Sequence, residues 1–135
     1  MRALPIALLA LAFVILPAAA LAQSADATAP REERFVHHVF FWLKNPNSAA
    51  DKAKLIAALH KLAAVDTIRR WQIGEPAATR RDVIDSSYSV SWTLMFDNAA
   101  DQQAYQADPI HLAFVEENAA LWERVVVYDT EPVGN

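Results

Sequence analysis

Residues 35–43 read FVHHVFFWL, and this stretch decides the fold. Both of its alternating sets are apolar and rich in β-branched and aromatic side chains, which predicts a β-strand covered on both faces. His37 and His38 are adjacent in the strand, so their side chains point to opposite faces. The two predicted faces carry His38, Phe40 and Trp42, and His37, Val39 and Phe41.

Two cap signals downstream of this strand predict helices. Ser48 stands three residues before Asp51, a capping-box spacing that opens a helix. Asn98 stands three residues before Asp101 and opens a second helix, which should break at Asp108–Pro109 because proline cannot continue a hydrogen-bonded turn. The other predicted elements are a strand over 68–73, a strand over 87–96, a restarted helix over 110–122 with Leu112, Val115 and Trp122 on one face, and a strand over 125–128.

The resulting order is β-α-β-β-α-β, which is typical of a ferredoxin-like fold of the α+β class. It predicts a four-stranded antiparallel sheet with the helices on one face. Since the strand at 35–43 is apolar on both faces, we expect the uncovered face to pack against a second copy of the chain as a homodimer. The serine-rich side of the strand at 87–96 leaves open the alternative that this face meets water.

The first 22 residues predict a signal peptide. Arg2 precedes an apolar stretch, and Ala20-Leu21-Ala22 has the small-x-small pattern that signal peptidases accept. Cleavage after Ala22 would export the chain to the periplasm or the medium, with no stable membrane insertion afterwards. The alternative is a retained anchor, because an apolar run of about 20 residues can span a bilayer. Residues 23–34 are small and polar, which predicts a disordered leader.

The composition excludes several function classes. The 135 residues contain no Cys, which rules out a disulfide framework, a thiolate zinc site and a cysteine nucleophile. The formal net charge of -4 argues against the basic stripe that a nucleic-acid surface needs, so we expect no nucleic-acid partner.

Three segments carry a family pattern: VHHVFFWLK at 36–44, YQADPIHLAFVEE at 105–117 and WERVVVYDTEP at 122–132. Together they resemble the stress-responsive α/β-barrel (Dabb) family over residues 35–132, which leaves 133–135 as a tail. The resemblance implies a dimeric α+β barrel. Most members have no assigned activity, but one plant branch comprises polyketide (olivetolic acid) cyclases, in which a His and a Tyr promote an intramolecular aldol condensation.

Taken position by position, the resemblance places the catalytic pair of the cyclase on His111 and Tyr105. Its pocket histidine in the first strand falls on His38, and its aspartate in the last strand falls on Asp129. The other pocket residues that the resemblance implies are Phe40, Trp42, Val90, Trp92, Leu94, Phe114, Trp122, Val125 and Val127.

His111 and Tyr105 would supply the chemistry of such a pocket. A neutral imidazole can take a proton and a phenol can donate one to a developing oxyanion, which suffices for enolisation, aldol or isomerisation chemistry. The two residues are six positions apart, so only the break at Pro109 would let both face one cavity. The alternative is that Tyr105 packs its ring on the sheet and His111 caps the restarted helix.

Asp129 has two possible roles: to orient His38 or His111 through a carboxylate–imidazole hydrogen bond, or to lie in water at a strand end. A metal site would need His38, His111 and Asp129 to converge, and we expect no metal and no other cofactor.

These features together predict an exported, stress-linked homodimer whose apolar pocket binds a small molecule. The alternative function is a cofactor-free lyase, cyclase or isomerase that uses His111 and Tyr105 as a general acid–base pair. Trp42 and Trp92 would crowd the pocket, which argues against a bulky acyl chain as ligand.

Overall fold

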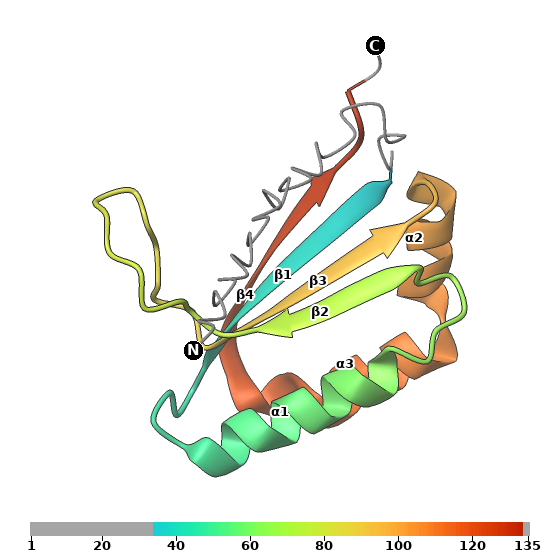
Figure 1. Ribbon diagram of the computed structural model, residues 1–135. Coiled ribbons are helices and arrows are strands. Elements are labelled where there is room, and N and C mark those ends of the chain that lie inside the picture. The colour runs from blue at the N-terminus through green and yellow to red at the C-terminus, as the bar shows by residue number, and fades with distance from the viewer. Residues whose placement is uncertain (1–33, 134–135) are drawn as a thin grey trace, which may run out of the picture. The chain divides into compact units, whose positions relative to one another are not determined.

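A computed structural model of the chain describes residues 34–133. Figure 1 shows its elements, which in chain order are β1 (Phe35–Leu43), α1 (Ala49–Leu62), β2 (Arg70–Gly74), β3 (Val90–Phe96), α2 (Ala99–Ala107), α3 (Pro109–Asn118), a short 3-10 helix η1 (Ala119–Leu121) and β4 (Trp122–Thr130). The order is β-α-β-β-α-β with the second helix broken in two, as the sequence predicts.

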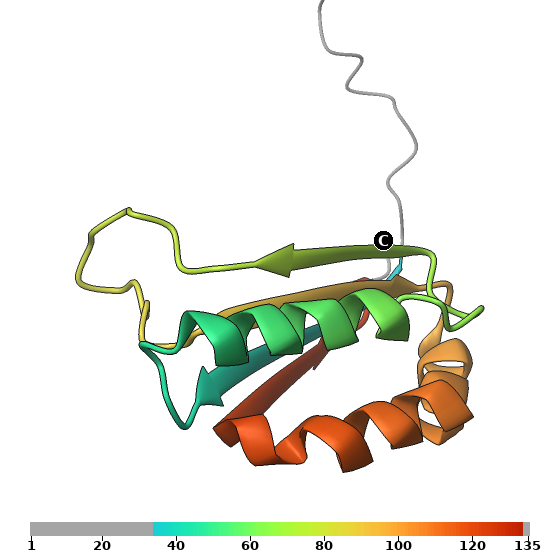
Figure 2. The ribbon, with the colours of Figure 1, turned by 90° about the horizontal axis from the view of Figure 1, so that it is seen from below.

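The strands form one antiparallel sheet in the order β2-β3-β1-β4. The helices lie on one side of this sheet, with α1 and α3 running across its face and α2 at one end (Figure 2). The chain therefore has the predicted ferredoxin-like α+β fold. Over the described residues, no helix covers the other face of the sheet.

Strand β1 lies in the middle of the sheet, and burial alternates along it. His37, Val39 and Phe41 are buried, whereas the residues between them are only partly buried. Because Val39 is paired with Trp92 of β3, the buried set of β1 faces the helices together with the buried set of β3. The partly buried set of β1 faces away from the helices.

The predicted caps form as expected. The Ser48 hydroxyl accepts a hydrogen bond from the Asp51 amide at 3.1 Å, and Asn98 accepts one from the Asp101 amide at 2.9 Å. At the break between α2 and α3, the Asp108 carboxylate accepts from the Ile110 amide at 2.7 Å, with Pro109 as the first residue of α3.

The end of α3 differs from the prediction, because Trp122 begins β4 rather than ending a helix. The helix stops at Asn118, whose side-chain amide donates to the Phe114 carbonyl at 2.9 Å. The Lys44 amide then donates to the Leu121 carbonyl at 3.0 Å and holds the chain at the end of β1, where β4 starts. Strand β4 is consequently longer than the predicted 125–128, and β3 starts at Val90 instead of Ser87.

The structure also contradicts the prediction that Leu112 and Val115 form the apolar face of α3. Leu112 and Val115 are 57% and 40% exposed, whereas Phe114 and Asn118 are buried. Within α3 the buried residues are Phe114 and Asn118, so only a narrow part of its surface meets the core.

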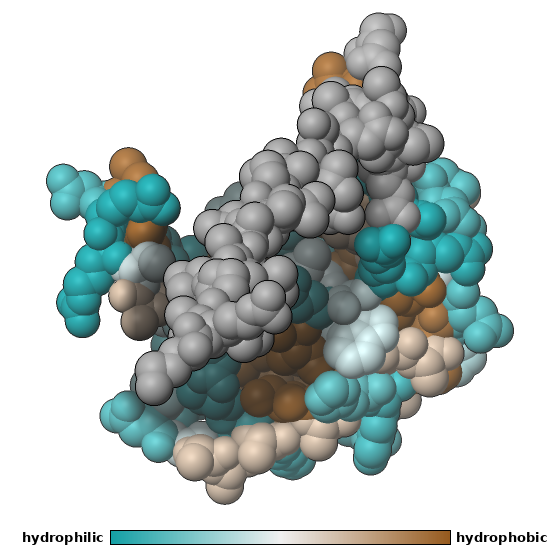
Figure 3. Space-filling view, viewed as in Figure 1, coloured by the Kyte–Doolittle hydropathy of each residue, from teal (hydrophilic) through white to brown (hydrophobic). Residues whose placement is uncertain are grey.

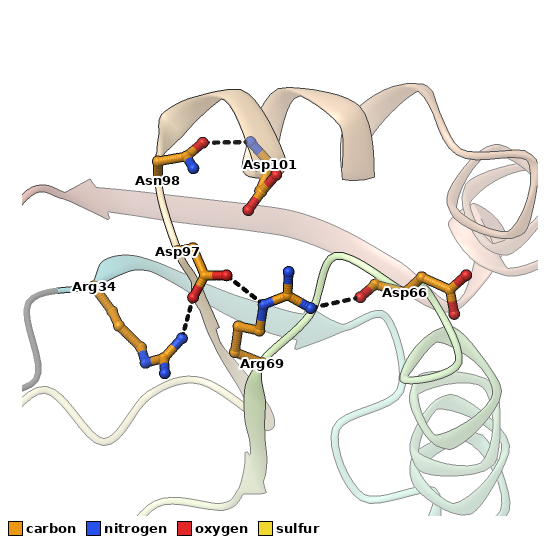
Figure 4. Close-up of polar contacts among 6 residues, drawn as sticks. All are labelled: Arg34, Asp66, Arg69, Asp97, Asn98 and Asp101. Atoms are coloured by element: carbon orange, nitrogen blue, oxygen red, sulfur yellow. Dashed lines mark hydrogen bonds and ion pairs between the residues drawn. The ribbon is translucent and has the colours of Figure 1, made fainter.

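An ion-pair cluster joins the start of β1 to the start of β2. The Asp97 carboxylate pairs with the Arg34 guanidinium and accepts from Arg69 Nε at 2.6 Å, while Arg69 also donates to the Asp66 carbonyl at 3.1 Å (Figure 4). The hydrogen bond from Arg69, together with the charges of Arg69 and Arg34, lowers the pKa of Asp97.

The loop between β2 and β3 projects beyond the sheet and is mostly hydrophilic (Figures 1 and 3). The predicted signal peptide and leader fall on residues that the structure does not describe, apart from Arg34, as do the last two residues of the tail. Within residues 34–133, no helix combines the length and the apolar character needed to cross a bilayer.

Candidate functional site

A cavity of about 260 Å³ lies between the sheet and the helices, and we call it the inner cavity. It is lined by His37, Val39, Phe41, Leu62, Trp92, Tyr105, Gln106, His111, Phe114, Val115, Trp122, Val125 and Val127. Most of these side chains are apolar. The polar ones lie on β1, α2 and α3, and the indoles of Trp92 and Trp122 lie on β3 and β4.

A larger depression of about 600 Å³ lies between α1 and α3. Its lining consists of Lys54, Ala57, Ala58, Lys61, Pro109, Ile110, Ala113, Phe114, Glu117 and Asn118. Its lining within residues 34–133 includes no His and no Tyr, and it is a groove between helices rather than a space against the sheet. The inner cavity is therefore the candidate functional site despite its smaller volume.

His37 and Asp129 form a hydrogen-bonded pair at the inner cavity, and His37 is part of its lining. They are paired residues on β1 and β4, and His37 Nδ1 is 2.5 Å from Asp129 Oδ1. His37 is 4% exposed, whereas the Asp129 side chain remains 43% exposed. Because the carboxylate accepts at Nδ1, the neutral imidazole carries its proton there and leaves Nε2 as the basic nitrogen.

Tyr105 lies on the opposite wall, on α2, and is 1% exposed. Its ring centroid is 5.9 Å from that of His37 and 4.6 Å from that of His111. Burial raises the pKa of Tyr105 to about 12, although the nearby Trp92 indole acts in the opposite direction. The phenol therefore keeps its proton at neutral pH and can act as a hydrogen-bond donor.

His111 lies in the first turn of α3 and reaches the same cavity. Burial lowers the pKa of His111, the Gln106 carbonyl and Asp108 act against this shift, and His37 adds to it. Its Nδ1 is buried without a hydrogen-bond partner. The break at Pro109 turns α3 away from α2, which is how residues six positions apart come to face one cavity.

Most predicted pocket residues do come together around the inner cavity. Those that line it are Tyr105, His111, Trp92, Phe114, Trp122, Val125 and Val127, and Asp129 reaches it through His37. Val90 and Leu94 face the same side of the sheet but are fully buried in the core without lining the cavity. Tyr105 packs on the sheet as in the alternative interpretation, yet it also borders the cavity.

The structure corrects the prediction of which side chains of the first strand face the pocket. His38, Phe40 and Trp42 lie on the face of the sheet away from the helices, where His38 Nδ1 is 3.3 Å from the Thr93 hydroxyl. The cavity receives His37 instead. The alternation along β1 separates the two sets correctly, but the cross-strand register decides which set faces the helices, and a shift of one residue exchanges them.

The three residues that a metal site would need do not converge, because His38 is on the opposite side of the sheet from His111 and Asp129. Among the described residues there is no group of three or more His, Asp or Glu placed to hold a metal ion. The titratable groups at the cavity are the imidazoles of His37 and His111 and the phenol of Tyr105, with the Asp129 carboxylate bonded to His37, and these groups can accept and donate protons.

The comparisons with known proteins agree with this fold. The model of the Stress responsive A/B Barrel Domain (Dabb) matches residues 35–132. No match was found among the curated proteins.

Three solved structures illustrate the likeness. A Dabb family protein with a ferredoxin-like fold from Mesorhizobium loti is 22% identical, with a TM-score of 0.64 over 76% of this chain and 99% of that one. A hydroxynitrile lyase from Passiflora edulis is 20% identical, with a TM-score of 0.65 over 77% and 97%. A dimeric ferredoxin-like protein of unknown function from Thermobifida fusca is 19% identical, with a TM-score of 0.60 over 78% and 96%. At these identities the likeness to solved structures shows the fold. The domain match over residues 35–132 shows the family, and the chain belongs to the stress-responsive A/B barrel (Dabb) family.

Proposed function

We propose that the chain acts as an exported, stress-linked homodimer whose inner cavity binds a small, mostly apolar molecule. The observation that carries the binding proposal is the composition of the cavity, in which apolar walls surround a few converging polar groups. This is the usual makeup of a small-molecule site, and a volume of about 260 Å³ suits a ligand of modest size.

The mouth of the cavity supports entry of an apolar ligand. Val115, Val125 and Val127 line the cavity and remain 37–45% exposed, so an apolar rim faces solvent. Among the residues that the structure describes, no Lys or Arg lines the cavity, and this favours a neutral ligand over an anionic one.

The homodimer proposal rests on the open face of the sheet. There Phe40 packs against Tyr88 at 4.9 Å and Tyr128 at 6.1 Å between ring centroids, and Tyr128 is 60% exposed. Arg124 lies 4.3 Å above the Trp42 ring. An exposed aromatic face of this kind is what a second copy would cover, and the similar protein from Thermobifida fusca is described as dimeric.

Export is proposed from the sequence of residues 1–22, and the link to stress comes from the family. Mass spectrometry of the full-length chain expressed in a bacterial host tests export. We expect a mature protein that begins at Gln23 in the periplasmic or secreted fraction, whereas an intact chain in the membrane fraction would show a retained anchor.

Ligand binding is tested by titrating the protein with ethylbenzene and acetophenone and following amide shifts by NMR. We expect saturable shifts confined to residues around the inner cavity. Val127→Trp should fill the cavity and abolish them, whereas Val83→Trp, in the exposed β2–β3 loop, should not. Failure of both probes to bind, or equal binding to Val127→Trp, would refute the proposal.

A second function, that of a cofactor-free lyase, cyclase or isomerase, is favoured by one specific observation. The Nδ1 atom of His37 is hydrogen-bonded to Asp129, and the ring of the protonated Tyr105 lies beside the His37 imidazole. His37 Nε2 would take a proton from a carbon next to a ligand carbonyl, while Tyr105 donates a hydrogen bond to the oxygen that becomes negative. Return of the proton to carbon restores the base, so the step balances without an added reactant.

A further inference from the structure

Phe114 of α3 borders two separate spaces in the structure. It lines the inner cavity, and it also lines the depression between α1 and α3, which we call the helix groove. Among the residues that the structure describes, no other residue lines both. The inner cavity of about 260 Å³ and the helix groove of about 600 Å³ therefore adjoin at the side chain of Phe114.

The geometry of α3 explains how one side chain can border both spaces. Residues three and four apart lie on the same side of a helix. Ile110 and Ala113 line the helix groove, whereas His111 and Val115 line the inner cavity. Phe114 follows Ile110 by four residues and His111 by three, so it occupies the boundary between these two sides of the helix.

Aromatic neighbours hold the Phe114 ring in place. The residue is 8% exposed, and its ring stacks on that of Trp122 with 5.8 Å between the centroids. The ring also meets that of Phe41 edge to face, with 6.4 Å between the centroids. Aromatic pairs of this geometry are favourable beyond the area that they bury. The ring is therefore a fixed wall between the inner cavity and the helix groove.

The helix groove has a lining that suits an alkyl chain. Helices α1 and α3 lie side by side on the sheet (Figure 2). The groove between them is lined by the small apolar side chains of Ala57, Ala58 and Ala113, and by Ile110, which is 39% exposed. Burying a methylene group on such a surface favours binding by up to about fourfold. The Phe114 ring stands between this surface and a chain that starts in the inner cavity.

We propose that Phe114 is a specificity-determining residue, which closes the inner cavity toward the helix groove and so limits the ligand to compact molecules without a long alkyl or acyl chain. This inference rests on the proposed function, namely that the inner cavity binds a small apolar molecule. The sequence predicts that Trp42 and Trp92 crowd the pocket. Since Trp42 lies on the other face of the sheet, it does not set the limit on ligand length.

Acetophenone and hexanophenone test this limit, because they differ only by four methylene groups in the alkyl chain. Their dissociation constants are measured by NMR titration. In the wild type, hexanophenone should bind more weakly than acetophenone, because its chain ends against Phe114. In Phe114→Ala, hexanophenone should bind at least about tenfold more tightly than acetophenone, because each methylene group that enters the helix groove adds up to about fourfold in affinity.

A substitution that fills the helix groove shows where the chain lies. In the Phe114→Ala background, Ala57→Trp should abolish the tighter binding of hexanophenone, while acetophenone still binds. Ala104→Trp, at an exposed site of α2 outside both linings, is the matched control and should leave the tighter binding intact. In Phe114→Ala, nuclear Overhauser effects should connect the terminal methyl group of hexanophenone to the Ala113 methyl group, which altered packing alone would not produce.

Phe114→Leu is used if Phe114→Ala does not fold. It removes the ring but keeps an apolar side chain in the core, so a smaller gain for hexanophenone is expected.

The outcomes separate this inference from the proposed function. If hexanophenone binds the wild type more tightly than acetophenone, the inference is wrong and ligand binding stands. The same holds if neither variant of Phe114 improves binding of hexanophenone, or if the improvement survives Ala57→Trp. If neither acetophenone nor ethylbenzene binds the wild type, the proposed function fails and the inference with it.

Discussion

Asp129 and His37 are paired across β4 and β1, and the carboxylate Oδ1 lies 2.5 Å from the imidazole Nδ1. The carboxylate is partly exposed at the edge strand, whereas the imidazole is almost completely buried in the inner cavity. The pair therefore connects the outermost strand to the polar centre of the cavity, and both stability and chemistry should depend on it.

Replacing Asp129 by Ala should destabilise the fold. The change leaves the buried Nδ1–H of His37 without its acceptor, and we expect a loss of about 1 kcal/mol because Asp129 itself is partly exposed. Urea unfolding at pH 7 measures it. Glu131→Ala, which removes an exposed carboxylate just after β4, is the control, and equal stability of the two variants would contradict the prediction.

His37→Gln and Tyr105→Phe test the catalytic alternative. If His37 is the base and Tyr105 the donor, the protein should accelerate exchange of the methyl hydrogens of acetophenone for deuterium in heavy water. Each variant should lower the accelerated rate about 100-fold. Proton NMR follows the exchange, and His60→Gln, at an exposed site outside the inner cavity, is the control. No acceleration by the wild type would leave ligand binding as the function.

His111 should make stability depend on pH in the weakly acidic range. Because burial lowers its pKa in the folded protein, the unfolded chain takes up a proton first as the pH falls. Stability is then fully present above about pH 6.5 and is lost as the pH falls through the folded pKa. Urea midpoints across this range measure the effect, which His111→Gln should reduce and His60→Gln should leave intact.

Asp97 should also make the free energy of unfolding fall as the pH falls, but in a lower pH range than His111. The pairing with Arg69 and Arg34 lowers its pKa, so its contribution to stability is present above about pH 4 and is lost as the pH falls through the folded pKa. Urea midpoints measured below about pH 4 should therefore depend less on pH in Asp97→Asn than in the wild type. Asp66 takes part in the cluster only through its backbone carbonyl, so Asp66→Asn should behave like the wild type (Figure 4).

Phe40→Glu should dissociate the proposed homodimer. The substitution places a charge in the aromatic face of the sheet, where burial against a second copy would leave it unpaired. Analytical ultracentrifugation at micromolar concentration should show a dimer for the wild type and a monomer for this variant. Leu112→Glu alters an exposed apolar residue on α3, away from that face, and should remain dimeric. A monomeric wild type would refute the dimer.

Much of the fold could be predicted from local patterns. Ser48 and Asn98 are cap residues whose function depends on a hydrogen bond from an amide three residues away, so the sequence alone reveals them. The end of α3 could not be placed in this way. Trp122 is apolar and at helical spacing, and only the contact of Lys44 with Leu121, far apart in the chain, makes it the start of a strand.

The candidate site was predicted in part. Tyr105 and His111 are placed in one cavity by the proline break, which is visible in the sequence. His37 was missed, although the alternation of β1 groups it with Val39 and Phe41, which also line the cavity. Matching the apolar set of the last strand, Val125 and Val127, to this set of β1 would have found it.

The sequence by itself determined the order of the elements, the positions of the caps and the separation of β1 into two sets of side chains, because these depend on periodicity and on contacts within a few residues. Only the tertiary structure decided that His37 rather than His38 meets Asp129, and that Trp92 and Tyr105 line one cavity. Both outcomes depend on strand register and on which face of the sheet the helices cover. These are set by packing between segments distant in the chain, where a shift of one residue exchanges the two faces.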